Sequence, residues 1–221
     1  MWYLFLQETH LTVDSERFLR SGWSFDCYLS GVETNKNGVA ILFNNTFEYK
    51  TFEVFRDTLE VILDVEIMMK RITLVNVYGP SSVKKPDFNN ISIQIDRMGN
   101  QLIIAGGDWN VLLNITFDAR NCKGYVNRPR ARRKILEIMY KYELIDVWRE
   151  VYPEKRGNTV QQGRLDYFLI SEELTLDVNG VKINPSYRSD HSLVCLELKT
   201  EGRKYGKQYW KFNSSLLKDK T

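Results

Sequence analysis

The sequence is poor in the residues and runs that define several large classes of protein. It has three cysteines and two histidines in 221 residues. The cysteines are scattered and form no C-x-x-C pair, so we expect a reducing compartment and neither a disulfide framework nor a zinc site. No apolar run approaches the roughly 20 residues that span a bilayer, so no membrane partner is expected. The apolar start, residues 1–6, lacks a basic segment and a cleavage site, which predicts a buried strand and no signal peptide.

Charge is small overall and unevenly distributed. The formal net charge is +3, with 43% hydrophobic and 27% charged residues, as in one soluble globular domain. Residues 199–221 contain seven lysines and arginines and two acidic residues, which gives this segment +5 and leaves −2 for residues 1–198. A second basic cluster lies at Arg128–Lys134. Both fit a polyanionic partner and equally a solvated surface. We expect a domain at residues 1–198 followed by a basic tail, residues 199–221.

Hydrophobic patterning predicts many short strands and few helices. Apolar and β-branched runs predict buried strands at Tyr3–Leu6, Gly38–Phe43, Leu59–Ile67, Ile72–Tyr78, Leu102–Ala105, Leu165–Ile170, Val181–Ile183 and Ser192–Leu198. Helical periodicity covers roughly Phe88–Arg97 and Ala131–Tyr142. The third and fourth strands should form a hairpin joined at Lys70-Arg71. So many strands suit an α/β architecture of mixed sheets packed on each other, with helices outside.

Acidic side chains stand at the ends of several predicted strands. Glu8, Asp108, Asp166 and Asp190 all lie at such places, and His191 follows the last of them. Carboxylates beside apolar strands need a partner or a metal ion when they are buried. An oxygen-rich set with one histidine suits Mg²⁺ or Mn²⁺ better than zinc. Taken one at a time, each residue also fits a turn, a surface ion pair or a structural hydrogen bond.

Six motifs occur in a particular order along the chain. They are Leu6–Leu11 (LQETHL), Gly38–Leu42 (GVAIL), Val75–Pro80 (VNVYGP), Ile104–Asn110 (IAGGDWN), Arg164–Tyr167 (RLDY) and Ser189–Ser192 (SDHS). This set resembles the endonuclease/exonuclease/phosphatase superfamily, in particular the apurinic-endonuclease-like endonuclease domain of non-LTR (LINE-type) retrotransposons. The ending YWKFNSSLL, residues 209–217, is similar to the segment that follows the endonuclease in such open reading frames. It favours the retrotransposon branch over a DNA-repair enzyme.

The resemblance implies a fold and an activity. The fold would be a DNase I-like four-layer α/β sandwich, with two packed mixed β-sheets flanked by helices. The activity would be phosphodiester hydrolysis that depends on Mg²⁺, or on Mn²⁺, and nicks one strand of host DNA. A reverse transcriptase domain elsewhere in the parent polyprotein would then use the exposed 3′-hydroxyl for target-primed reverse transcription. This implies a monomer that works in the nucleus.

The resemblance also assigns roles to individual residues. Glu8 would be the principal metal ligand, and Asp190 would be another. Asp108 and Asn110 would bind and activate the attacking water or protonate the leaving oxygen. His191 would contact the scissile phosphate, oriented by Asp190. The remaining assignments are Asp166 in the nucleophile and phosphate region, Tyr78 as a donor to the phosphate, and Thr159, Ser189, Arg128, Arg130 and Arg132 as substrate-binding residues. The arginines fit a solvated helix equally well.

The chain departs from the family pattern at three places. In the family, a strand bearing an asparagine near the metal precedes the LQETHL motif. Here Met1 lies only seven residues before Glu8, so we expect that strand to be absent and a sheet edge to be open. The loop between Thr159 and Arg164 is short, and Trp109 replaces the commoner phenylalanine. A catalytically impaired DNA-binding remnant, or an abasic-site or other phosphoesterase of the superfamily, therefore stays an alternative.

Overall fold

The computed structural model describes residues 2–12, 15–17, 25–30, 37–44, 46, 48–79, 88–120, 128–160, 163–187 and 189–199. The predicted basic tail lies outside this part of the chain, apart from Lys199.

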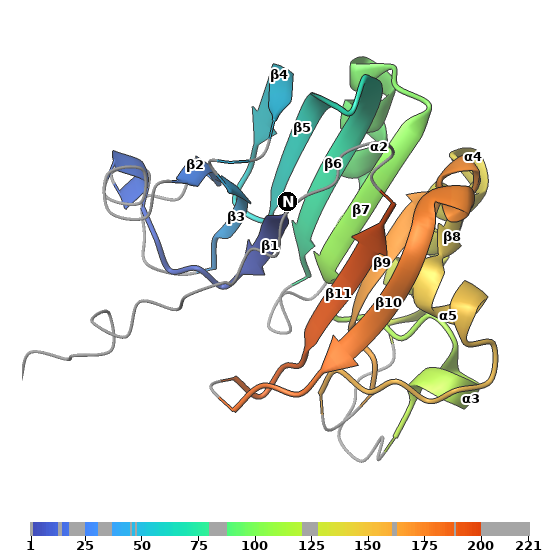
Figure 1. The fold of residues 1–221 in the computed structure, drawn as a ribbon. Coiled ribbons are helices and arrows are strands. Elements are labelled where there is room, and N and C mark those ends of the chain that lie inside the picture. The colour runs from blue at the N-terminus through green and yellow to red at the C-terminus, as the bar shows by residue number, and fades with distance from the viewer. Residues whose placement is uncertain are drawn as a thin grey trace, which may run out of the picture.

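A six-stranded sheet forms the centre of the molecule (Figure 1). Its strands, in spatial order, are β4 (Tyr49–Arg56), β5 (Glu60–Ile67), β6 (Lys70–Tyr78), β7 (Leu102–Asp108), β9 (Asp166–Ser171) and β8 (Leu144–Asp146). β6 and β7 pair in parallel, and the other neighbours in this sheet are antiparallel. β5 and β6 are apolar and buried over most of their length because both faces of the sheet are covered.

Two helices cover one face of this sheet (Figure 1). α2 (Asn89–Met98) connects β6 to β7 and directs Ile91, Ile95 and Met98 into the core, at the spacing of one helix face. α4 (Pro129–Lys141) packs on the same core. Both predicted helices are confirmed to within two residues at each end. The shorter elements are α3 (Ile115–Asp118), α5 (Val147–Val151) and the 3₁₀ helix η1 (Glu172–Asp177). No helix among the described residues is long and apolar enough to cross a membrane.

Two small antiparallel sheets cover the opposite face (Figure 1). The first has β3 (Val39–Asn44) between β1 (Tyr3–Gln7) and β2 (Phe25–Leu29), and the second pairs β10 (Val178–Asn184) with β11 (Leu193–Leu198). Apolar side chains of β3 and β5 meet between the layers and form a second core. The predicted α/β sandwich of packed sheets flanked by helices is confirmed. Within the part of the chain that the structure describes, however, the second layer consists of two antiparallel sheets in place of one mixed sheet.

Three strands and one turn differ from the prediction. The sequence patterning does not predict β2, β4 or β8. The hairpin between β5 and β6 turns at Met68-Met69, and Lys70-Arg71, the predicted turn, belongs to β6. Both methionines have positive φ, 51° and 63°, as the tight turns of two-residue hairpins require.

Asn76 joins the two layers near the end of β1. Its side chain is fully buried and donates to the carbonyls of Leu6 and Ala40, at 3.0 and 2.8 Å. Its Oδ1 accepts a hydrogen bond from Gln7 Nε2 at 2.6 Å. A buried amide whose nitrogen and oxygen both have hydrogen-bond partners holds the segments that it contacts in fixed positions. The end of β1, immediately before Glu8, is therefore held against the central sheet.

Candidate active site at the strand ends

Strand register brings three of the predicted residues side by side. Tyr78 is paired with Asp108 across the parallel strands β6 and β7. Asp108 in turn lies opposite Asp166 across the antiparallel strands β7 and β9. β6 and β7 end at this place and β9 begins here, so three polar side chains that are distant in sequence gather at one edge of the sheet.

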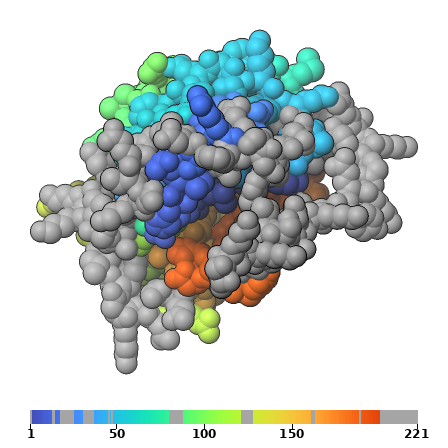
Figure 2. Space-filling model, turned by 90° about the vertical axis from the view of Figure 1, so that its left-hand side faces the viewer, coloured from blue at the N-terminus to red at the C-terminus, as the bar shows by residue number. Residues whose placement is uncertain are grey.

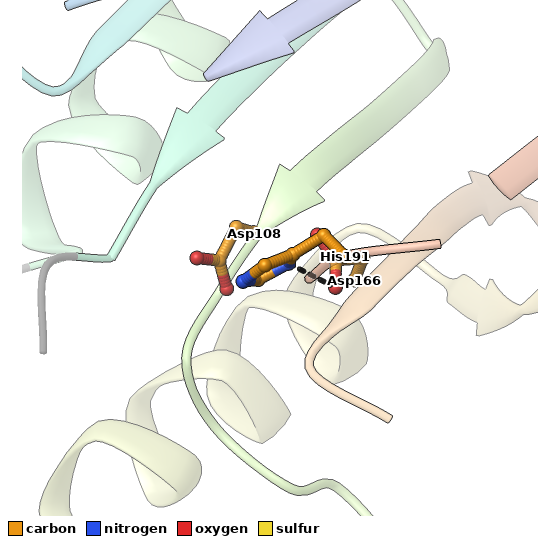
Figure 3. A group of neighbouring side chains, drawn as sticks. All are labelled: Asp108, Asp166 and His191. Carbon is orange, nitrogen blue, oxygen red and sulfur yellow. Dashed lines mark hydrogen bonds and ion pairs between the residues drawn. The ribbon is translucent and has the colours of Figure 1, made fainter. Parts of the chain in front are cut away.

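The imidazole of His191 is held by Asp166. Its Nδ1 donates to the two oxygens of the Asp166 carboxylate, at 3.0 and 2.9 Å, and the ring lies between Asp166 and Asp108 (Figure 3). The prediction that Asp190 orients this ring is wrong, because the hydrogen-bond partner of Nδ1 is Asp166. Asp190 is exposed beside the histidine. The hydroxyl of Ser189 accepts a hydrogen bond from the backbone amide of His191 at 3.0 Å, which shapes the turn that presents the ring.

The environment shifts two pKa values toward or beyond neutrality. The hydrogen bond to Asp166 raises the pKa of His191 to about 9, so the imidazole is cationic at neutral pH. Burial raises the pKa of Asp108 to about 7, and the negative charge of Asp166 adds to this effect. Perturbed groups that meet in a cavity are typical of functional sites.

Glu8 and Asn110 have left-handed backbone conformations, with φ angles of 50° and 53°. Asparagine adopts this region readily, but glutamate seldom does, and such residues cluster at functional sites. The Tyr78 hydroxyl donates a hydrogen bond to the Glu8 carboxylate, and burial together with this carboxylate raises the pKa of Tyr78 far above its usual range. The backbone amide of Asn110 donates to Asp108 Oδ1 at 2.9 Å.

A cavity of about 440 Å³ opens beside these side chains. The predicted site residues that line it are Glu8, Asp108, Asp166, Ser189, Asp190 and His191. Such a volume is in the range of ligand sites in proteins, several hundred Å³. The structure thus brings six predicted residues to one cavity. Tyr78 and Asn110 form hydrogen bonds with two of them, Glu8 and Asp108.

The donor atoms around the cavity suit a hard cation. Carboxylate oxygens of Asp108 and Asp166 lie within 4.8 Å of one another and of a ring nitrogen of His191, which is cationic at neutral pH and therefore not itself a ligand. The predicted ligands Glu8 and Asp190 line the same cavity and add two more carboxylates. Oxygen-rich sets of this kind fit Mg²⁺ or Mn²⁺. A cation would also favour the charged form of Asp108, whose pKa is raised by burial and, to a smaller extent, by the charge of Asp166.

Thr159 is buried and hydrogen-bonded within the protein, which does not fit its predicted role in substrate binding. It is 1% exposed, and its hydroxyl accepts hydrogen bonds from the backbone amides of Leu165 and Asp166, at 2.9 and 3.1 Å. Its carbonyl accepts the amide of Ser192 at 2.7 Å. A side chain buried in this way cannot reach a bound strand of DNA. Thr159 instead fastens together the two segments that carry Asp166 and His191.

The three predicted arginines have different surroundings. Arg132 Nε donates to the Leu113 carbonyl at 2.7 Å, which gives this side chain a structural contact. Arg130 is exposed at the start of α4. Arg128 is the residue at the N-cap of α4, and its positive charge makes a small contribution that lowers the pKa of Tyr78. Contact of Arg128 and Arg130 with a substrate stays a prediction.

A buried ion network supports the site, and the sequence patterning does not predict it. Arg164, 1% exposed, donates to both oxygens of Asp118 at 3.0 Å and to Asp146 Oδ1 at 3.0 Å. Arg149 also pairs with Asp118, at 2.5 Å. The network links α3, the end of β8 and the segment before β9. The RLDY motif is a signal for it, because an arginine two residues before a site carboxylate needs acidic partners if it is buried.

Together, the sheets and the carboxylate–histidine cluster define a DNase I-like α/β sandwich with an acidic site at its strand ends. The chain belongs to the endonuclease/exonuclease/phosphatase family, whose sequence profile matches residues 3–191. This is a family of nucleases and phosphatases.

Known proteins support this assignment. Over 228 residues the chain is 28% identical to the transposon TX1 uncharacterized 149 kDa protein of Xenopus laevis, and the match covers 97% of the chain and 17% of that relative. The AP endonuclease LMAP of Leishmania major has a TM-score of 0.67 at 17% identity, over 90% of this chain and 78% of its own. An AP endonuclease of Archaeoglobus fulgidus has a TM-score of 0.66 at 20% identity, over 90% and 89%. At such identities the two structures support the fold alone.

Proposed function

We propose that this domain hydrolyses phosphodiester bonds in DNA and nicks one strand, as the endonuclease of a LINE-type retrotransposon. The observation that carries the proposal is the His191–Asp166 pair next to Asp108 in one cavity. Cleavage at phosphorus needs positive charge for the phosphate oxygens and a group that accepts a proton from water. This cluster supplies a cationic imidazole and a carboxyl group with a pKa near neutrality.

The proposal includes a divalent cation, Mg²⁺ or Mn²⁺. Glu8 and Asp190 would hold it, since both carboxylates line the cavity and Glu8 is fixed by the Tyr78 hydroxyl. When bound, the cation would neutralise charge on the phosphate and lower the pKa of a bound water.

Side chains of the protein would then bind the phosphate and activate the attacking water. Asp166 holds Nδ1 of His191, which leaves Nε2 free to donate to a phosphate oxygen. Asp108 would accept a proton from the attacking water, a task for which a pKa near the working pH is suited. Asn110, fixed by its backbone bond to Asp108, would orient that water. Tyr78 would move its hydrogen bond from Glu8 to the phosphate when DNA binds.

The retrotransposon assignment rests on the TX1 relative. The chain spans about a sixth of the length of that protein, so a much longer parent protein is consistent with the match. We propose that a reverse transcriptase domain elsewhere in such a parent uses the nick as a primer, in the nucleus.

The test is conversion of supercoiled plasmid to open circle, with Mg²⁺ or with EDTA. We expect nicking in Mg²⁺ only, and a loss of at least about 100-fold in Asp108→Asn and in His191→Ala. The matched control is Asp96→Asn, which alters an exposed acid of α2 that pairs with Lys141. Nicking that persists in EDTA, or in both site variants, would contradict the proposal. Cleavage of a duplex with an abasic analogue but not of intact plasmid would identify an abasic-site endonuclease.

A further inference from the structure

Three large apolar side chains are exposed at the end of the molecule that lies away from the cavity. Met68 and Met69, in the turn between β5 and β6, are 42% and 93% exposed, and Leu176 of η1 is 82% exposed. β6 runs from this turn to Tyr78 at the site, and β9 runs from Asp166 at the site to η1. The turn and η1 therefore stand at the strand ends opposite to those that form the cavity. The turquoise residues of the β5–β6 hairpin reach the surface near the top of both views (Figures 1 and 2).

An ion pair joins the two parts of this surface. Lys70, the residue after Met69, donates to Asp177, the residue after Leu176, with 2.6 Å between Nζ and Oδ2. The apolar side chains therefore flank one contact between the hairpin and η1. Single exposed apolar side chains are ordinary, whereas a group of them is typical of a contact surface. We call Met68, Met69 and Leu176 the far-end patch.

The chain continues into its basic tail directly beside the far-end patch. Lys199, the last described residue, is bonded to η1 twice: its amide donates to the Asp177 carbonyl at 2.7 Å, and its Nζ donates to the Leu176 carbonyl at 2.9 Å. Residues 200–208 follow, and then the aromatic segment YWKF, residues 209–212. Nine residues span up to about 30 Å. The aromatic segment is therefore long enough in its connection to return to the patch where the tail starts.

The charge around the patch complements the charge of the tail. Glu172 and Glu173 are exposed in the first turn of η1. The exposed Glu143 lies next to them, because its carbonyl accepts the amide of Glu172 at 3.0 Å. Residues 200–212 contain four basic residues and one acidic residue, which gives them +3. Opposite charges at the rim of a contact favour the approach of the correct partner and fix its register.

We propose that the YWKF segment docks on the far-end patch of its own chain, with the indole of Trp210 against Met69 and Leu176. Tryptophan and tyrosine are frequent anchors of protein contacts, and methionine is enriched there as well. The flexible thioether of methionine also makes favourable contacts with aromatic rings. Docking would hold the basic tail at the end of the sandwich away from the acidic cavity. The proposal does not depend on the activity proposed above.

The methionine methyl signals provide a direct test. The sequence has five methionines, so ¹³C-methyl labelling of the whole chain gives a simple NMR spectrum, in which Met68→Leu and Met69→Leu assign the patch signals. We expect a nuclear Overhauser contact between the Met69 methyl group and the Trp210 indole. In Trp210→Ala, the ring-induced shifts of the two patch signals should be lost. Met98 and Met139, which pack in the core under the helices, are internal references and should not move.

Cleavage by trypsin after Lys211 measures the docked fraction of the tail. When opening and closing are fast, the rate of cleavage follows the population of the open form. We expect the unaltered chain to be cleaved at least about ten-fold more slowly than Leu176→Asp, as for a tail that is docked about nine-tenths of the time. Leu176→Asp adds charge at an exposed position, so folding should survive. The matched control on the fold is Ile93→Asp, at a 61% exposed position of α2, and the control on the tail is Tyr205→Ala. Both should be cleaved as slowly as the unaltered chain.

Three results would overturn the proposal. One is that Trp210→Ala leaves the signals of Met68 and Met69 in place. Another is that the shifts and the protection from trypsin grow with protein concentration, which would make the tail of a second copy the occupant. The third is that Leu176→Asp is cleaved no faster than Ile93→Asp. Neither measurement involves catalysis, and His191→Ala should give the same spectrum and cleavage rate, so failure of the proposed nuclease activity would be seen separately.

Discussion

His191 and Asp166, 25 residues apart in sequence, form a hydrogen-bonded pair at the centre of the site. The pair joins the start of β9 to the turn before β11, that is, the central sheet to the second layer. The histidine side chain is about one third exposed and the aspartate less so, which leaves the ring able to meet a ligand. An imidazole held at Nδ1 by a carboxylate presents Nε2 in a fixed direction, as in other carboxylate–histidine pairs.

The first prediction concerns the charge of this histidine. Asp166→Asn removes the hydrogen bond that is the largest cause of the raised pKa of His191, so that pKa should fall from about 9 toward the ordinary value of 6.5. The measurement is an NMR titration of the histidine ring signals in metal-free buffer. The sequence has two histidines, and His10→Gln assigns the signals.

Asp190→Asn is the matched control, because Asp190 contributes only a smaller charge effect to His191. It should lower the histidine pKa much less than Asp166→Asn does. An equal effect of the two variants would mean that Asp190 shares the hydrogen bond in solution.

The location of the site could be predicted from the sequence, but its internal pairing could not. Polar motifs at strand ends identify Glu8, Asp108, Asp166 and His191, because strand ends of the central sheet and of both small sheets converge on one cavity. The sequence predicts Asp190 as the partner of His191 because the two residues are adjacent in the chain. The ring is presented by a turn, however, and the sequence does not show that this turn directs it toward Asp166, 25 residues away.

The sequence gives no signal for the orientation of Thr159 or for β8, whereas it does give one for β4. Thr159 acts through its buried hydroxyl and carbonyl, and nothing in the short loop indicates which way its side chain points. β8 has three residues, too few for a periodic signal. β4 does carry a signal, since YKTFEVFR alternates between apolar and charged residues as an edge strand with one covered face does.

The second prediction concerns Asp108 and stability. The pKa of this carboxyl is raised from 3.8 to about 7 in the folded chain, so the folded state binds the proton more tightly than the unfolded state. The resulting stabilisation is complete below about pH 4 and is lost as the pH rises through 7. Asp108→Asn should therefore stabilise the metal-free chain at pH 8, on the order of 1–3 kcal/mol, while it abolishes nicking.

Urea denaturation at pH 5 and pH 8 in EDTA measures this effect. The difference in unfolding free energy between the two pH values should shrink in Asp108→Asn and stay unchanged in Asp96→Asn, whose acid is exposed on α2. If Asp108→Asn were destabilising at pH 8, the carboxylate would have to be stabilised in the folded state, against the direction of the pKa shift.

The third prediction concerns Thr159 as a positioning residue. Thr159→Val keeps the shape of the side chain but leaves the buried amides of Leu165 and Asp166 without their acceptor, which should cost about 1–3 kcal/mol of unfolding free energy. Thr159→Ser keeps the hydroxyl and should recover most of the loss. Because Asp166 shifts when its backbone amide is released, the NMR pKa of His191 should fall in Thr159→Val and return in Thr159→Ser. A stability loss with an unchanged histidine pKa would show that Thr159 supports the fold without positioning the site.

The last prediction concerns the ion network beneath the site. Arg164→Met preserves much of the side-chain volume but leaves Asp118, which is fully buried, with Arg149 as its remaining cation. Removing one partner of a buried ion pair typically destabilises by about 3–5 kcal/mol, because the other charge stays buried. The matched control is Arg97→Met, which removes a cation that is 62% exposed and paired with Glu53, and it should cost less than about 1 kcal/mol. Urea denaturation measures both variants. The double variant Arg164→Met with Asp118→Asn removes one of the two carboxylates that lose this arginine and should be more stable than Arg164→Met alone. A double variant that is less stable than Arg164→Met would mean that Arg149 alone satisfies Asp118 and that Arg164 acts mainly through Asp146.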